Sequence, residues 1–385
     1  MGPSTLASDT LRDVAQPVAI YIHTPFCPSK CGYCDFNSYA MSGEIVDRTV
    51  NAIVAEIRAS QFAGRPAKTI FVGGGTPTYL SATQLTSILQ AVMETHPPIP
   101  GCEITSEGNP GTVDIPKFEA MRQAGFNRIS LGAQSFQTED LVRLGRVHAP
   151  THIGTAVAAA RRAGFENLNL DLMYALPGQS VAAWKMNLQT ALDLQPDHLS
   201  LYCLTIEQNT RFYKFNLRGM LDIPAEDHQI EMYDLACSMT QSAGFHQYEI
   251  SNFAKPGLEC KHNIEYWMGE EYLGYGPGAV GAYDPPGQGR VRFNVLKHPE
   301  RYSEAVEQGK KTWYEEEQLS PEDVRFEQIM LGIRLNEGVS TQRLTLNQKG
   351  LEDVVKRGWV ERNGDGVRLT HAGRHFCSRV AVELA

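Results

Sequence analysis

Short apolar segments alternate with longer amphipathic segments through the first half of the chain. The short segments are rich in Ile, Val, Leu, Phe and Tyr, a composition that is typical of buried strands. They cover residues 18–23, 69–72, 103–106, 128–131, 168–173 and 199–204. Strands that alternate with helices form parallel βα units. The pattern therefore predicts an α/β protein, and six such units suit a partial (β/α)6, TIM-like barrel.

The longer segments repeat their apolar residues at helical spacing, which predicts helices between the strands. Ser81 precedes one of these runs and is a predicted N-cap. One apolar face comprises Ile45, Val46, Val50, Ile53, Val54 and Ile57, and another comprises Leu85, Ile88, Leu89 and Val92.

Beyond about Thr205 the alternation weakens, and residues 244–300 are rich in Gly, Pro and aromatic residues. Helices are predicted over 225–243, 321–333 and 347–357. A hairpin is predicted about the turn Asn363-Gly364-Asp365-Gly366. Helices followed by a hairpin resemble a winged helix, a small α+β domain. The acidic triplet Glu315-Glu316-Glu317 before this tail is predicted to be a solvated linker. The predicted organisation is an N-terminal tail (1–16), a barrel core (17–245), an extension (246–314) and a winged-helix-like C-terminal domain (315–385).

Composition and charge narrow the function classes. With 385 residues the chain exceeds one average domain. Its net charge of −9 argues against general polyanion binding, because phosphate backbones require an excess of Lys and Arg. No run of eighteen apolar residues exists to form a membrane-spanning helix. The first sixteen residues lack the apolar region of a secretory signal.

Three of the eight cysteines, Cys27, Cys31 and Cys34, form a CxxxCxxC motif directly after the first predicted strand. Structural zinc prefers four ligands, and no second cysteine pair is present. A disulfide framework is not expected in so long a chain with so few cysteines. Three clustered thiolates can hold three irons of a four-iron cluster and leave the fourth iron open to a small chelating molecule.

Polar or glycine-rich runs follow the next predicted strands. Gly73-Gly74-Gly75-Thr76 follows the second strand, a run that begins at Glu107 follows the third, and one that contains Gln134 follows the fourth. Asp171 lies near the end of the fifth. In barrels of parallel strands the functional residues gather where the strands end, so these runs are expected to meet the cysteine loop.

These motifs resemble the radical SAM superfamily, whose open iron binds S-adenosylmethionine (SAM). Within it, the chain resembles the branch that holds oxygen-independent coproporphyrinogen III dehydrogenase and the HemW haem chaperones. The resemblance extends from about Ala19 to the C-terminus. It implies a radical SAM barrel, a [4Fe-4S] cluster on the three cysteines, and a SAM site made by Tyr21, Gly74, Gly75, Thr76, Glu107, Gln134, Arg146, Asp171 and Val280. For Arg146 and Asp171 a structural ion pair is the competing interpretation. The sequence does not decide whether one or two SAM molecules bind.

Two features distinguish the members of this branch. The dehydrogenase pattern has a fourth cysteine where this chain has Phe36, and its N-terminal arm is longer. Phe at this position is usual in the HemW branch. There the motif HNxxYW, matched here by His262, Asn263, Tyr266 and Trp267, is associated with haem binding, with the histidine as iron ligand. A packed histidine with aromatic neighbours is the competing interpretation, and Cys260 is a rival ligand.

The resemblance thus predicts a haem chaperone that holds a cluster, SAM and haem and delivers haem to acceptor proteins, with a membrane surface as the expected place of delivery. It implies an electron donor for the cluster and leaves a homodimer open. Oxygen-sensitive thiolates favour the cytoplasm, either free or peripheral to the membrane. The alternative is an enzyme, either the dehydrogenase or another radical SAM oxidoreductase, and no catalytic residue is assigned. A nucleic-acid-modifying enzyme is disfavoured because the chain is acidic, so no nucleic-acid partner is expected.

Overall fold

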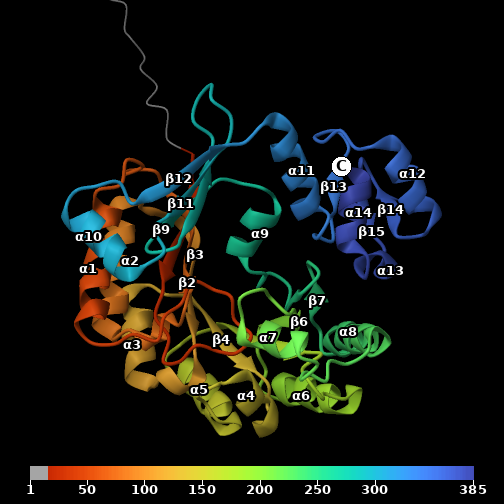
Figure 1. Cartoon of the computed structure of the whole chain (residues 1–385), viewed down its shortest axis with the longest axis horizontal. Helices are drawn as coiled ribbons and strands as arrows, with labels where there is room; N and C mark the ends of the chain where they lie inside the picture. The colour runs from red at the N-terminus through yellow and green to blue at the C-terminus, as the bar shows by residue number, and fades with distance from the viewer. Residues whose placement is uncertain (1–15) are drawn as a thin grey trace, which may run out of the picture.

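Six parallel strands form the wall of an open barrel in the computed structural model, which describes residues 16–385 (Figure 1). The tail predicted over 1–16 lies outside this range except for Gln16. All six predicted strands are present, each in parallel register with the next. They are β1 (Val18–Thr24), β2 (Ala67–Gly74), β3 (Pro98–Gly108), β4 (Arg128–Gln134), β5 (Asn167–Tyr174) and β6 (His198–Cys203).

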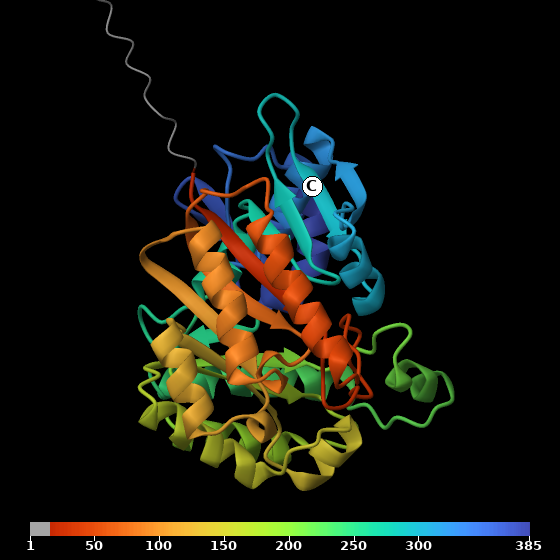
Figure 2. The same ribbon diagram turned by 90° about the vertical axis from the view of Figure 1, so that its left-hand side faces the viewer.

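Helices follow the strands and cover the outside of the barrel (Figure 2). The predicted apolar faces are the buried faces, with Val50 and Ile53 against the sheet and Leu85 and Ile88 beside them. Ser81 is an N-cap as predicted, in a reciprocal capping box with Gln84. The helices are α1 (Glu44–Arg58), α2 (Ala82–Thr95), α3 (Ile115–Ala124), α4 (Thr138–Leu144), α5 (Pro150–Arg162), α6 (Val181–Asp193), α7 (Arg211–Leu217) and α8 (Glu226–Ser242), with short 3-10 turns η1 (Pro77–Tyr79) and η2 (Pro110–Thr112).

The barrel sheet continues beyond the six predicted strands at both edges. On one side β9 pairs in parallel with β1, and three antiparallel strands follow it. On the other side β8 and then β7 extend β6. These additions are β7 (His246–Gln247), β8 (Asn252–Ala254), β9 (Tyr272–Tyr275), β10 (Val280–Tyr283), β11 (Val291–Val295) and β12 (Trp313–Gln318), and α10 (Pro299–Glu307) packs beside α1.

The predicted acidic linker at residues 315–317 is wrong. These residues belong to β12, where they pair with Asn294, Phe293 and Arg292 of β11. Their side chains are exposed because β12 is the last strand of the sheet. Charged side chains are usual on such edge strands, since they discourage pairing with another chain. A charge run that resembles a linker was therefore an edge strand.

Helix α9 (Lys261–Trp267) lies across the open side of the barrel (Figure 1). The buried carboxylate of Glu103 on β3 accepts hydrogen bonds from the backbone N–H groups of Lys261 and His262, both at 3.1 Å. It also accepts from the thiol of Cys260 at 3.5 Å. A carboxylate at a helix N-terminus is favoured by the helix dipole. Glu103 precedes the ligand-facing end of β3, so α9 is anchored away from the cysteine loop.

The C-terminal domain has a hydrophobic cluster of its own, which includes Ile333, Val354 and Val367. Its three-stranded sheet has the order β13-β15-β14, and the predicted helices and hairpin are confirmed. The domain is winged-helix-like and lies beside α9 and α8 (Figure 1). Its elements are α11 (Pro321–Gly332), β13 (Val339–Ser340), α12 (Gln348–Lys356), β14 (Val360–Asn363), β15 (Gly366–Leu369), α13 (His371–Arg374) and α14 (Cys377–Leu384). Within residues 16–385, no helix combines the length and the apolar character that crossing a bilayer requires.

Candidate cluster and cofactor site

The cysteine loop follows β1 and is tied to the barrel rim at several points. The backbone N–H of Cys27 donates to the carbonyl oxygen of Tyr39 at 3.0 Å. Gly32 donates to Leu144 at the end of α4, and its own carbonyl oxygen accepts from Phe212 of α7. These bonds fix both ends of the CxxxCxxC segment, so its three thiols line one cavity.

Two polar side chains from other loops of the barrel rim reach the sulfur atoms. The hydroxyl of Thr76 donates to Sγ of Cys27 at 3.4 Å, and Nη1 of Arg146 donates to Sγ of Cys31 at 3.7 Å. Burial raises the pKa of the Cys27 and Cys34 thiols above their ordinary value. The thiols therefore favour the protonated form unless a cation neutralises their charge, as iron does on binding.

The glycine run after β2 is a turn that no larger residue fits. Gly74 has φ 104°, in the region that favours glycine, and a Cβ on it would lie 2.5 Å from the His23 ring. A Cβ on Gly75 would lie 2.6 Å from the carbonyl oxygen of Phe26. The N–H groups of Gly75 and Thr76 donate to β1 and the cysteine loop. The turn can therefore offer carbonyl oxygens to a ligand. Carbonyl oxygens accept hydrogen bonds, so they suit the amino group of SAM.

Two half-buried carboxylates, Glu107 and Asp171, face the same cavity from β3 and β5. Glu107 accepts from the N–H of Gly74 at 3.1 Å. Burial, with a contribution from Asp171, raises the pKa of Glu107 to about 8. Burial also raises the pKa of Asp171, although Asn169 and Ser130 donate hydrogen bonds to it. Such carboxylates can accept from the hydroxyl or amino groups of a bound ligand.

Gln134 and Arg146 complete the rim beside β4. Gln134 is a non-glycine residue with φ 65° at an irregularity in the β4–β5 register, which turns it towards the cavity. Nη2 of Arg146 donates to the carbonyl oxygen of Gly132 at 2.7 Å. The buried Nε of Arg146 has no hydrogen-bond partner among the described residues, which leaves a donor for a ligand. Among the described residues, neither Arg146 nor Asp171 forms an ion pair. The interpretation that these two residues serve only as a structural ion pair therefore has no support.

One cavity therefore collects most of the predicted cluster and SAM residues. It also contains residues that the sequence did not single out, notably Ser38 and Asn109. Asn109 lies in the polar run after the third strand, and this position is the sequence signal that could have identified it as a site residue. The predicted residues that line the cavity are Cys27, Cys31, Cys34, Gly74, Gly75, Thr76, Glu107, Gln134, Arg146 and Asp171.

Tyr21 and Val280 lie elsewhere. They line a second cavity of about 540 Å³, between the barrel and α11, together with Tyr266 and Trp267. The hydroxyl of Tyr21 bonds to Nδ1 of His23 at 3.0 Å. His23 lines this second cavity and packs against Gly74 of the first, so its ring lies in the wall between them.

The HNxxYW residues lie on α9, where His262 is buried under β2 with 1% of its surface exposed. Nδ1 of His262 bonds to the hydroxyl of Thr69 at 2.7 Å, and Nε2 bonds to the hydroxyl of Tyr266 at 3.0 Å. Burial lowers the pKa of His262 to about 3, so the ring is neutral at physiological pH. Neither His262 nor the half-buried Asn263 lines the second cavity, which Tyr266 and Trp267 border. His262 can ligate iron only after it parts from Tyr266.

The raised pKa of Glu107 predicts a pH-dependent stability. Between pH 4.5 and about 8 the folded chain retains a proton that the unfolded chain has lost, so the carboxylate lowers stability as the pH rises. Glu107→Gln stays neutral. Its Tm in SAM-free protein should exceed that of the wild type by about 2–4 °C more at pH 8.5 than at pH 5. Glu94→Gln is the control, since its bonds to Gln90 and Arg58 lower the pKa of that carboxyl. An equal Tm difference at both pH values would contradict the assignment.

Comparison with known proteins first defines the class. The fold matches coproporphyrinogen III oxidase from Escherichia coli, described as a radical SAM enzyme, with a TM-score of 0.81 and 23% identity over 97% of this chain and 91% of that one. The radical SAM superfamily model matches residues 21–191, and the HemN C-terminal domain model matches residues 319–376. The fold and the cysteine site thus define a radical SAM protein with a HemN-type C-terminal domain.

Sequence relatives narrow the class further. The chain is 37% identical to the haem chaperone HemW of Bacillus subtilis, over 92% of this chain and 95% of the relative. It is 37% identical to the haem chaperone HemW of Escherichia coli, over 94% of this chain and 96% of the relative. A mitochondrial radical SAM domain-containing protein of Danio rerio is 33% identical to this chain, over 89% of this chain and 78% of the relative. The chain belongs to the HemW family of the radical SAM superfamily.

Proposed function

We propose that this chain is a haem chaperone of the HemW type, which binds haem and passes it to acceptor proteins. Identity of 37% to two proteins named haem chaperone HemW, over more than nine-tenths of the chain, carries the proposal. The HNxxYW helix supports it, because Tyr266 and Trp267 line a cavity that a single histidine ring separates from the glycine turn.

In this proposal Cys27, Cys31 and Cys34 hold a [4Fe-4S] cluster. The donor set fits, because three thiols line one cavity and the raised pKa values of Cys27 and Cys34 mean that a bound cation would stabilise their thiolates. A reduced cluster with one open iron supplies an electron to a sulfonium group. SAM would be held by Gly74, Gly75, Thr76, Glu107, Gln134, Arg146 and Asp171. The chain's part is to orient SAM through the turn carbonyls and the orphaned Nε of Arg146, and to exclude water.

Haem in this proposal enters the second cavity and is ligated by Nε2 of His262. Thr69 holds Nδ1 and so fixes the ring, a common arrangement for metal-binding histidines. The hydroxyl of Tyr266 occupies Nε2 and must be displaced. Arg290 and Arg292 line the cavity, and their guanidinium groups, which are paired with Asp284 and Glu327, would exchange these partners for the two haem carboxylates. Asn263 and Trp267 belong to the haem site in this proposal. Tyr21 and Val280 stay assigned to SAM, although they line the second cavity.

Delivery requires partners and a location. We assign the chain to the cytoplasm, with transfer of haem to acceptor proteins at a membrane surface and with an electron donor for the cluster. The wall at His23 offers a physical route by which the state of the cluster cavity can influence haem release, since its ring contacts Gly74 and lines the haem cavity. A homodimer is compatible with this arrangement.

Haem titration of the reconstituted protein tests the proposal. His262→Ala should weaken haem affinity at least about tenfold and change the Soret spectrum, because an iron ligand is lost. His96→Ala is the matched control. His96 is equally buried, and its Nε2 likewise bonds to a tyrosine hydroxyl, that of Tyr275. Tyr275 does not line the cavity, whereas Tyr266, the partner of His262, does. Equal affinity and identical spectra for wild type and His262→Ala would remove His262 from the site.

Tyr266→Phe tests the displacement step. Loss of one hydrogen bond to Nε2 should tighten haem binding about 2- to 10-fold, because that bond no longer competes with iron. Tyr272→Phe is the control, since Tyr272 packs against Tyr266 in the same cavity without contacting His262. Weaker binding in Tyr266→Phe would instead indicate that the phenol oxygen itself ligates iron.

A coproporphyrinogen III dehydrogenase activity is the competing function, supported by the fold match alone. Phe36 lines the mouth of the cluster cavity and is 59% exposed, in the position of the dehydrogenase's fourth cysteine. Anaerobic incubation of the reconstituted protein with coproporphyrinogen III, SAM and a reductant separates the two functions. Formation of the decarboxylated product would favour the enzyme.

A further inference from the structure

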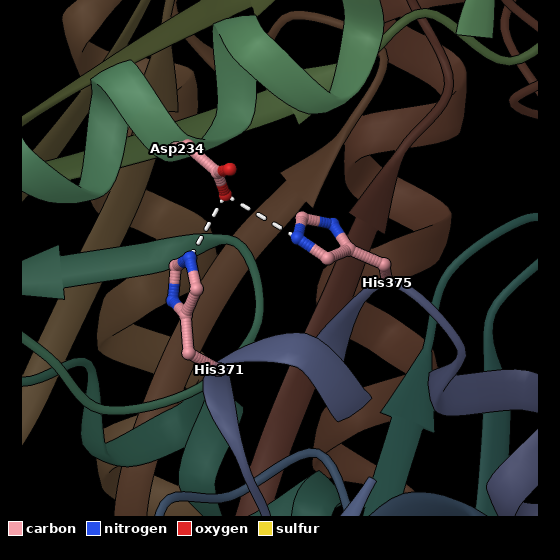
Figure 3. A group of neighbouring side chains, drawn as sticks. All are labelled: Asp234, His371 and His375. Atoms are coloured by element: carbon pink, nitrogen blue, oxygen red, sulfur yellow. Dashed lines mark hydrogen bonds and ion pairs between the residues drawn. The ribbon is translucent and has the colours of Figure 1, made fainter. Parts of the chain in front are cut away.

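Two histidines of the C-terminal domain meet an aspartate of the barrel, far from both cavities. His371 and His375 lie one helical turn apart at α13, and Asp234 lies in the middle of α8, 137 residues before His371 (Figure 3). Both rings point their Nε2 atoms at the same carboxylate oxygen, Oδ1 of Asp234. These three residues, called here the α8–α13 triad, take no part in the proposed haem function.

The distances in the triad match a metal coordination shell. Oδ1 of Asp234 lies 2.9 Å from Nε2 of His371 and 3.3 Å from Nε2 of His375, and all three ligand atoms lie within 4.8 Å of one another. Ligands about 2.0–2.1 Å from a tetrahedral zinc ion are about 3.3 Å apart. A small adjustment of side chains would therefore admit the ion between the three atoms.

The surrounding residues hold the triad in place. The ring of Tyr233, the neighbour of Asp234 on α8, lies 6.3 Å from the His371 ring and 5.4 Å from the His375 ring. The Thr370 side chain caps α13 by accepting from the N–H of Gly373. Arg374, between the two histidines, donates to Gln247 and Asn336. The backbone that carries both imidazoles is thus fixed before any ion arrives, which reduces the entropic cost of binding.

The chemistry of the donors selects the ion. Two imidazoles and one carboxylate form the ligand set of open zinc sites, in which water takes the fourth position. Imidazole disfavours Mg²⁺ and Ca²⁺, which prefer oxygen ligands. The side chains of Asp234 and His371 are 45% and 55% exposed, so an ion can enter and leave from solvent. Without an ion the same atoms form an ordinary hydrogen-bonded ion pair, which is the alternative that a test must exclude.

We propose that Asp234, His371 and His375 bind one divalent transition-metal ion of the zinc class, which links the C-terminal domain to α8 of the barrel. The ion would bridge two parts of the chain that otherwise meet here through polar contacts and would stabilise their docking by mass action.

Cobalt and zinc binding to the cluster-loaded, chelator-treated protein tests the proposal. One equivalent of Co²⁺ should bind with a tetrahedral visible spectrum that lacks thiolate charge-transfer bands, and Zn²⁺ should displace it and raise Tm. The cluster occupies Cys27, Cys31 and Cys34, and a second measurement in a background with serine at these positions removes thiolate binding by the cluster loop. The double variant His371→Ala/His375→Ala should lose at least about tenfold in affinity.

Two further variants make the outcome decisive. Asp234→Asn keeps the size of the side chain and should also weaken Co²⁺ binding at least about tenfold. His152→Ala/His228→Ala, which removes two exposed histidines on α5 and α8, should leave it unchanged. Absence of saturable uptake, or uptake that the double variant and Asp234→Asn both retain, would overturn the site and leave only the ion pair.

Discussion

Serine in place of Cys27, Cys31 or Cys34 is expected to reduce the iron and sulfide content of anaerobically reconstituted protein to background. Each thiol is one of only three protein ligands, and a serine hydroxyl does not ionise readily enough to replace a thiolate. Two remaining ligands cannot hold a cubane that already has one open iron. The visible absorption of the cluster and any change of its EPR spectrum on addition of SAM should disappear together.

Control variants for this experiment come from the other cysteines. Cys203→Ser and Cys377→Ser change thiols that are also half-buried but do not line the cluster cavity, so iron content should be retained. The cysteine loop lies at the rim of the barrel, so the Cys27→Ser fold should survive, as a far-ultraviolet CD spectrum would show. A Cys27→Ser protein that keeps its full iron and sulfide content would refute the assigned ligand set.

The second large effect is expected from Gly75→Ala. The added Cβ would meet the backbone of Phe26, with the carbonyl oxygen at 2.6 Å and the nitrogen at 2.9 Å. Backbone cannot rotate away as a side chain can, so the segment that leads into Cys27 must shift. Overpacking of this kind typically costs about 1–3 kcal/mol. The glycine turn and the first cysteine would move together, and SAM affinity should fall at least about tenfold, since placement errors of about 1 Å have effects of this size.

SAM binding to the reconstituted protein, followed by equilibrium dialysis or by EPR, measures this effect. Gly154→Ala is the matched control. Gly154 lies in α5, and a Cβ there would meet only Leu194 at 3.9 Å, an ordinary contact. That variant should bind SAM normally and gain slightly in stability, because alanine favours a helix. Normal SAM affinity in Gly75→Ala would show that the turn does not contact the ligand.

Local patterns in the sequence predicted much of the barrel and of the cluster cavity. Each of the six strands is a short apolar run, and Gly74, Glu107 and Gln134 lie where such runs end. Parallel strands bring their ends to one rim, so residues distant in sequence are expected to converge there. Ten of the predicted cluster and SAM residues line that single cavity for this reason. The winged-helix-like tail was predicted in the same way, from its helices and hairpin turn.

The sequence did not reveal the contacts that depend on how distant segments pack. Residues 315–317 were predicted as a linker because their charge suggests solvent exposure, and exposure alone does not distinguish a loop from an edge strand. The side chain of Tyr21 lies on the inner face of β1. It borders the second cavity because α9 and α11 pack opposite this part of the strand. No periodicity in the sequence carries that information.

By itself the sequence determined the class of this protein, because cluster ligands and glycine turns depend on short spacings that the local chain enforces. Only the tertiary structure decided that His262 is buried with both ring nitrogens engaged, and that Asp234 faces His371 and His375. Tyr266 lies four residues from His262 on α9, but the contacts of His262 with Thr69 and of Asp234 with His371 span more than a hundred residues of chain. Such contacts are selected by the packing of the whole hydrophobic core, which no local pattern specifies.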